Sequence, residues 1–190
     1  MIYGAYLQFL KIFVIIIIEK IKKEVIIMAN KVKGLKKINR TVNNFTRQFG
    51  VRAKLHTEFQ AICDDMIIGY ALTVDEDEQQ FFIEDAHKRY PDIQADIMLW
   101  CLMHEIGHCM TDKMWTKEEL EYFWYQKDHC AYVEEDQLRN DWYHATPDEF
   151  FATRWAGEYM RKHPKKVAKF WNKLQKELIK FYQKNNLSED

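Results

Sequence analysis

The sequence predicts an α+β domain that is mostly helical and carries a small mixed β-sheet. Three observations lead to this prediction. Apolar residues recur at three- and four-residue steps in several segments, as in amphipathic helices. Short runs rich in β-branched and aromatic residues lie between the first helical segment and the middle of the chain. The 190 residues include only 6 Gly and 3 Pro, with 15% aromatic residues, which excludes a disordered or repeat protein and favours a compact domain.

Residues 1–27 differ from the rest, and we expect residues 28–190 to form a single domain. The apolar stretch near the start is interrupted by Lys11 and falls short of the roughly 20 residues that a spanning helix needs. No basic region precedes it and no small-residue cleavage site follows, which argues against a signal peptide. Residues 23–28 can be back-translated into a bacterial ribosome-binding sequence before the codon of Met28. We therefore interpret residues 1–27 as an over-extended reading frame, with a hydrophobic membrane anchor as the alternative.

The first half of the domain is predicted to be a helix followed by a sheet. Apolar residues from Val32 to Phe49 recur at helical steps, and Gly50 is expected to end that helix. Strands are predicted at residues 51–59, 66–74 and 80–84. The acidic residues 75–78 are interpreted as a hairpin turn between the last two. An edge strand of this sheet could hold an extended peptide by main-chain hydrogen bonds.

The second half is predicted to be helical. A helix apolar nearly all round is expected to begin at Pro91-Asp92 and reach Thr111, as in a helix buried at the domain centre. Further helix starts are a capping box at Thr116 and Glu119, Thr146-Pro147, and Pro164. We expect the small sheet to pack beside the central helix.

The central helix contains His104-Glu105-Ile106-Gly107-His108, which reads His-Glu-x-x-His. Residues four apart lie about one turn apart on one helix face, so His104 and His108 can reach the same metal ion. Glu105 would lie beside that metal, where it can take a proton from a metal-bound water. Gly107 leaves room for another backbone or a substrate close to the metal. The alternative is a pair of core histidines satisfied by hydrogen bonds.

A catalytic zinc site usually has three protein ligands and an open position. Glu149, in the first turn of the helix that begins at Thr146-Pro147, is our candidate for the third ligand. Ala152, Thr153 and Ala156 share its side of the helix, and small residues there allow close approach to another helix. Glu149 also occupies the position of a capping-box glutamate, which is the purely structural alternative.

The four cysteines show no Cys-x-x-Cys pair and no disulfide-type spacing, so we expect reduced thiols. Cys101 and Cys109 lie near the metal face of the central helix and are rival ligands, although buried free cysteine is common. Residues 31–54 and 161–184 are basic. They offer weak nucleic-acid contact, or they are simply solvated helix faces.

The two helical motifs together resemble the zincin-type zinc metallopeptidases with a glutamate third ligand. More narrowly, they resemble the ImmA/IrrE-like family of bacteria, phages and mobile elements, over about residues 51–160. The matching residues are His104-Glu105-x-Gly107-His108 and Glu149-x-x-Ala152-Thr153-x-Trp155-Ala156.

By that resemblance the domain has a zincin-like fold, His104, His108 and Glu149 bind Zn²⁺, and Glu105 is the general base. Two features depart from the family pattern. Thr153 stands where the family usually has Asn or Asp, four residues after the ligand glutamate. The stretch between His108 and Glu149 is longer than usual, which keeps Glu134 and Glu135 as alternative ligands.

The resemblance implies a zinc metallopeptidase that hydrolyses peptide bonds with a zinc-activated water and Glu105 as general base. We expect an intracellular, cytoplasmic regulatory protease of a bacterium or phage that acts on a protein or peptide. The alternative is a zincin-fold metal-binding module that acts through nucleic-acid or protein partners without catalysis.

Overall fold

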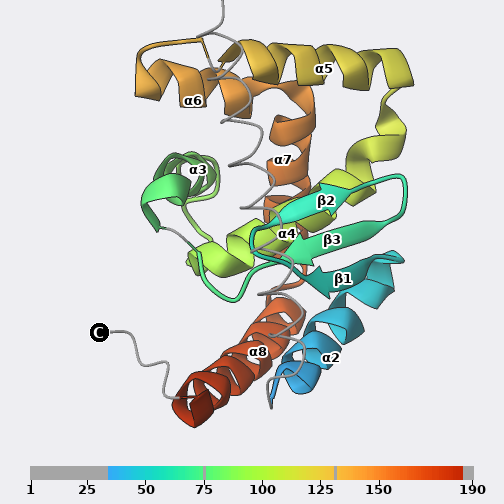
Figure 1. Ribbon diagram of the computed structural model, residues 1–190, viewed down its shortest axis with the longest axis vertical. Helices are drawn as coiled ribbons and strands as arrows, with labels where there is room; N and C mark the ends of the chain where they lie inside the picture. Colours follow the sequence, from blue (N-terminus) through green and yellow to red (C-terminus); the bar gives the residue numbers. More distant parts are fainter. Residues whose placement is uncertain (1–33, 75, 131, 186–190) are drawn as a thin grey trace, which may run out of the picture.

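A computed structural model describes residues 34–74, 76–130 and 132–185. Helices surround a small three-stranded sheet, which confirms the predicted α+β class (Figure 1). Helices α5 and α6 lie together at one end of the molecule and α2 and α8 at the other, with the sheet and α4 between them (Figure 1). The segment 1–27, interpreted above as an over-extended frame or anchor, lies outside the described residues. Within the described ranges, no helix has both the length and the apolar character needed to cross a bilayer.

Helix α2 (Leu35–Thr46) is the first helix predicted from the sequence. A short 3-10 turn, η1 (Arg47–Phe49), follows it, and Gly50 ends it with a left-handed φ of 76°, as the sequence predicted. The apolar face of α2 packs against α8 (Pro164–Asn185), the predicted closing helix. The rings of Phe45 and Phe170 stack between the two helices with centroids 3.9 Å apart.

The sheet contains β1 (Arg52–Leu55), β2 (Gln60–Ile62) and β3 (Ile67–Tyr70) in the order β1-β3-β2. Strand β1 is parallel to β3 and β2 is antiparallel to it, so the sheet is mixed, as predicted. Strands β1 and β3 lie within two of the predicted runs, whereas β2 lies just after the first of them. Strand β2 is at the edge of the sheet and packs beside α4.

The third predicted strand, residues 80–84, is wrong, and so is the hairpin turn before it. These residues belong to helix α3 (Glu76–Arg89). Phe82, Ala86 and Tyr90, four residues apart, are all buried on one face. His87, Lys88 and Arg89 lie in the last turn of α3, where positive charge complements the helix dipole.

Helix α4 (Ile97–Thr111) begins later than predicted. Pro91 and Asp92 form a turn, and the N-cap is Asp96, whose carboxylate accepts from the amide of Met98 at 2.9 Å. The predicted burial of this helix is confirmed. Its buried residues include Trp100, Met103, His104, Ile106 and Gly107.

Three helices complete the region around α4: α5 (Lys117–Cys130), α6 (Asp136–Ala145) and α7 (Pro147–Lys162). The capping box of α5 is confirmed, because the Thr116 amide donates to Glu119 at 2.7 Å and the Glu119 amide donates to Thr116 at 3.2 Å. Thr146 occupies the N-cap of α7, as predicted. Its hydroxyl donates to the carbonyl of Tyr143 at 2.7 Å and does not cap the helix.

Candidate metal centre

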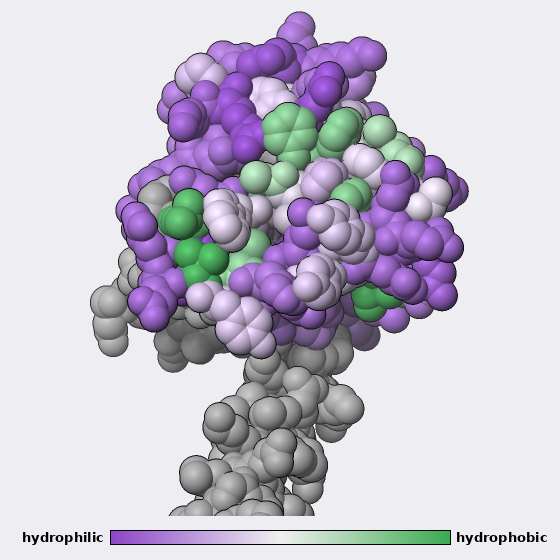
Figure 2. Space-filling model, turned by 90° about the horizontal axis from the view of Figure 1, so that it is seen from above, coloured by the Kyte–Doolittle hydropathy of each residue, from purple (hydrophilic) through white to green (hydrophobic). Residues whose placement is uncertain are grey.

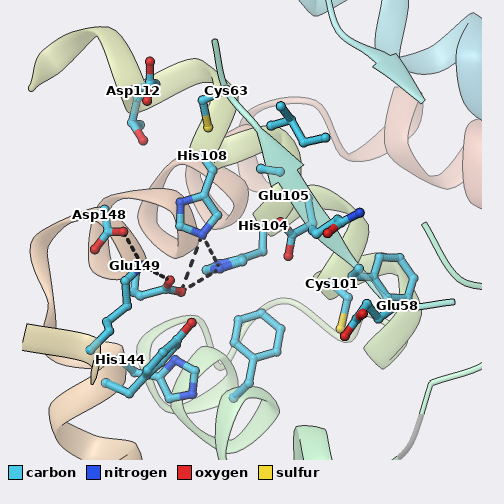
Figure 3. Close-up of a pocket in the computed structure, with 18 of the residues that line it drawn as sticks. Glu58, Cys63, Cys101, His104, Glu105, His108, Asp112, His144, Asp148 and Glu149 are labelled. Atoms are coloured by element: carbon cyan, nitrogen blue, oxygen red, sulfur yellow. Dashed lines mark hydrogen bonds and ion pairs between the residues drawn. The ribbon is translucent and has the colours of Figure 1, made fainter. Parts of the chain in front are cut away.

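The structure brings His104, His108 and Glu149 together, although 40 positions separate the last two in the sequence. His104 Nε2 lies 3.0 Å from both His108 Nε2 and Glu149 Oε2, and His108 Nε2 lies 3.5 Å from Glu149 Oε2. The two rings and the carboxylate point toward one another (Figure 3). Ligand atoms about 2.0–2.1 Å from a metal in a tetrahedral site are themselves about 3.3 Å apart. The three groups therefore have the chemistry and the spacing to hold a metal ion.

The close approach of α4 and α7 makes this grouping of side chains possible. A Cβ at Gly107 would lie 2.4 Å from the carbonyl oxygen of Ala152, a distance that real Cβ atoms do not adopt. The backbones of α4 and α7 are therefore in contact at Gly107 and Ala152, about one turn after Glu149. This confirms two predictions: that Gly107 makes room for another backbone, and that the small residues of α7 allow close packing.

Thr153 contacts the first histidine from α7. Its Oγ1 lies 3.0 Å from His104 Nδ1, and both groups are buried. When Nδ1 carries the proton and donates it to Thr153, Nε2 is free to face Glu149 and His108. Thr153 can therefore orient the ring from the position at which the resemblance leads us to expect Asn or Asp.

Glu105 lies beside the three-residue group and outside it, facing the same cavity (Figure 3). Burial is the main reason why the pKa of its carboxyl is raised to about 7, and the nearby charge of Glu149 raises it further, whereas His104 and Lys127 oppose the shift. A carboxyl with a pKa near neutrality can both accept and release a proton under ordinary conditions.

Lys127 of α5 is a member of the site that the sequence analysis missed. Its buried ammonium donates to Glu149 Oε1 at 2.9 Å and to Asp148 Oδ2 at 2.5 Å. Burial lowers the pKa of Lys127, but Glu149 and Asp148 outweigh it and the pKa is raised overall. Lys127 is therefore a permanent cation beside the site. The only sequence signal was a lysine at the apolar spacing of Phe123 and Cys130, which are also buried in α5.

The electrostatics of Glu149 favour its charged form. Burial raises the pKa of this carboxyl, but the nearby His108 and His104 side chains lower it more, and the pKa lies well below its usual range. A charged carboxylate is the form that binds a metal ion.

The other candidate ligands lie outside the three-residue group. Glu134 and Glu135 are exposed, and neither belongs to the group of His104, His108 and Glu149. All four cysteines are free, as predicted. Cys101 and Cys109 are buried on α4 but lie outside the group as well.

The group of His104, His108 and Glu149 faces a cleft of about 880 Å³. The lining of this cleft includes the edge strand β2, Leu120, Trp124 and Lys127 of α5, and Tyr143 and His144 of α6. Figure 2 looks down on the α5–α6 end of the molecule and shows apolar and weakly polar residues gathered within a mostly hydrophilic surface. Exposed aromatic residues of these two helices are Tyr122, Trp124, Tyr125, Trp142 and Tyr143.

Tyr143 and His144 of α6 both line this cavity. Burial, followed by the charge of Glu149, raises the pKa of Tyr143. Tyr143 therefore remains a proton donor. Burial lowers the pKa of His144, with Glu149 opposing the shift.

Comparisons with protein-family models, curated proteins and solved structures find no match to this chain.

Proposed function

We propose that the protein is a zinc-dependent metallopeptidase, with the zincin-like organisation and the regulatory role in a bacterium or phage that the ImmA/IrrE resemblance implies. The observation that carries the proposal is the meeting of His104, His108 and Glu149 in a cleft that also holds Glu105. A purely structural zinc site is usually closed by four protein ligands and has no need of a general base. Here three ligands and a neighbouring carboxyl face an open cavity.

His104, His108 and Glu149 would hold the ion. When bound, zinc supplies Lewis acidity, which activates water and polarises a carbonyl group. Glu105 takes up the proton of the attacking water and later delivers it to the leaving amine, a task for which a pKa of about 7 is suitable.

The cleft walls support a peptide as the substrate. Among the described strands β2 pairs with β3 alone, so its other edge can pair with an extended chain beside the metal centre. Tyr143 lines the same cleft and keeps its proton, so it can donate to the oxyanion that forms during hydrolysis.

The test combines metal analysis with a cleavage assay on residues 28–190. We expect near-stoichiometric zinc in the wild type and in Glu105→Gln, and loss of zinc in Glu149→Ala. A peptide library followed by mass spectrometry should show cleavage by the wild type and by neither Glu105→Gln nor Glu149→Ala. Glu134→Ala and Glu135→Ala are matched controls that should keep both zinc and cleavage.

Each contrary outcome has a distinct meaning. Cleavage by zinc-loaded Glu105→Gln would remove Glu105 from the role of base. Full zinc in Glu149→Ala would reject Glu149 as the third ligand. A zinc-loaded wild type that cleaves no peptide in the library would reject the peptidase and favour a metal-binding module.

A further inference from the structure

The two oxygens of the Glu149 carboxylate face different partners. Oε2 faces His104 Nε2 at 3.0 Å and His108 Nε2 at 3.5 Å. Oε1 accepts from the ammonium of Lys127 at 2.9 Å. Only one oxygen is therefore directed at the metal centre, and the other is held by a cation.

Lys127 is itself held firmly in place. Its side chain is 6% exposed, and its second carboxylate partner is Asp148 on α7. The ammonium also lies 4.5 Å from the ring centre of Trp124 and 5.5 Å from that of Tyr143. Two carboxylates and two aromatic faces thus fix the ammonium, which in turn fixes the orientation of Glu149.

We propose that Lys127 is a positioning residue that restricts Glu149 to ligation through a single oxygen and so keeps a coordination position open. The inference rests on the proposed function, because it concerns the ion that His104, His108 and Glu149 would hold. Carboxylates bind metals through one or both oxygens. A second oxygen from Glu149 would occupy the position that a catalytic zinc site must leave free.

The charges around the site distinguish this role from simple neutralisation. Lys127 pairs with both Asp148 and Glu149, so its removal leaves an additional uncompensated negative charge close to the metal centre. By Coulomb's law that charge attracts a divalent cation. Loss of Lys127 should therefore preserve metal binding while changing how Glu149 binds the metal.

The experiment is the visible absorption spectrum of the cobalt(II)-substituted protein, which reports the coordination number, for the wild type and Lys127→Met. We expect an intense four-coordinate spectrum in the wild type. In Lys127→Met the spectrum should weaken toward that of a higher coordination number, with cobalt still bound stoichiometrically. Peptide cleavage by the zinc form should fall by about 10–100-fold in kcat, the usual effect of removing a group that orients a ligand.

Two further variants control for folding and for charge. Lys127→Met combined with Asp148→Asn removes the buried unpaired carboxylate, and it should fold and show the same altered spectrum even where Lys127→Met alone does not fold. Lys117→Met removes an exposed lysine from the same helix, and it should keep the wild-type spectrum.

A wild-type spectrum in folded Lys127→Met, or in the double variant, would overturn the inference and leave the proposed function intact. Failure of either variant to bind cobalt would overturn it as well and assign Lys127 a structural role. Failure of the wild type to bind cobalt or zinc would reject the proposed function, and the role of Lys127 with it.

Discussion

The α2–α8 pair and the α4–α7 pair bury side chains of different chemistry. Between α2 and α8 the buried residues are almost all apolar, and Phe45 stacks on Phe170 at 3.9 Å. Between α4 and α7 the contact buries His104, Glu149 and Thr153. Burial of polar groups is unfavourable unless each finds a partner.

The α2–α8 contact should contribute mainly to stability, whereas the α4–α7 contact should also determine whether the candidate site forms. Any well-packed apolar residues could join α2 to α8, because hydrophobic contact has little directional requirement. The α4–α7 contact depends on particular atoms: the Gly107 backbone, the Thr153 hydroxyl and the Glu149 carboxylate. We therefore expect mutations in the first pair to change stability alone, and mutations in the second to change metal binding.

The largest effect on stability is expected from Phe170→Ala. Truncation of a buried aromatic side chain leaves a cavity and should lower the free energy of unfolding by about 3–5 kcal/mol. Urea denaturation measures this, and zinc per folded chain should stay at the wild-type value. Lys169→Ala, at an exposed neighbouring position, is the control. Loss of zinc from folded Phe170→Ala would contradict the separation of the two pairs.

Zinc itself should stabilise the fold through the α4–α7 pair. A ligand that binds only the folded state adds about 2.7 kcal/mol at a hundredfold excess over its Kd. Thermal denaturation with and without zinc should show this increase in the wild type and in Phe170→Ala, but not in Glu149→Ala. An equal increase in Glu149→Ala would place the zinc elsewhere.

Gly107→Ala should break the α4–α7 pair directly. The new methyl group would meet the Ala152 backbone, and overpacking of this kind costs about 1–3 kcal/mol. Alanine favours the helix over glycine by about 1 kcal/mol. A net fall in the free energy of unfolding must therefore come from the contact between α4 and α7. Zinc binding should also weaken, because the ligands move apart. Met110→Ala, on the exposed side of α4, should keep zinc affinity.

Thr153→Val should have the smallest effect, and one confined to the metal. Valine matches the shape of threonine but offers His104 no acceptor, so zinc affinity should fall about tenfold, equivalent to about 1.4 kcal/mol. Competition with a coloured chelator measures the affinity. Thr153→Ser keeps the hydroxyl and should bind zinc as the wild type does. Equal affinities in the valine and serine variants would remove Thr153 from the orienting role.

The parts of the site that the sequence predicted are those encoded by local spacing. His104 and His108 lie one turn apart in any helix, and Thr146-Pro147 favours a helix start, which predicted Glu149 in a first turn. Small residues on the Glu149 side also predicted the close packing of two helices. The convergence of Glu149 with the histidines could be inferred only because both motifs occurred in one chain.

The errors arose where local patterns were ambiguous or where contacts are distant in sequence. Residues 80–84 contain two Phe and an Ile, which fit a strand as well as the buried face of a helix. Tertiary packing favours the helix. Pro91 indicated a helix start, but the helix begins after Asp96, which is its N-cap. No spacing rule connects Lys127 with Asp148 and Glu149, which lie on different helices, so their ion pairs were not predictable from the sequence.

Two helix ends of opposite polarity meet at the group of His104, His108 and Glu149. His108 lies in the last turn of α4, where the dipole favours a cation, and Glu149 lies in the first turn of α7, where it favours an anion. The charged carboxylate is thus stabilised by α7 and Lys127 before any metal arrives. We expect the chain to fold first and acquire its ion afterwards. Which metal ion each molecule binds would then depend on the ions available to it after folding.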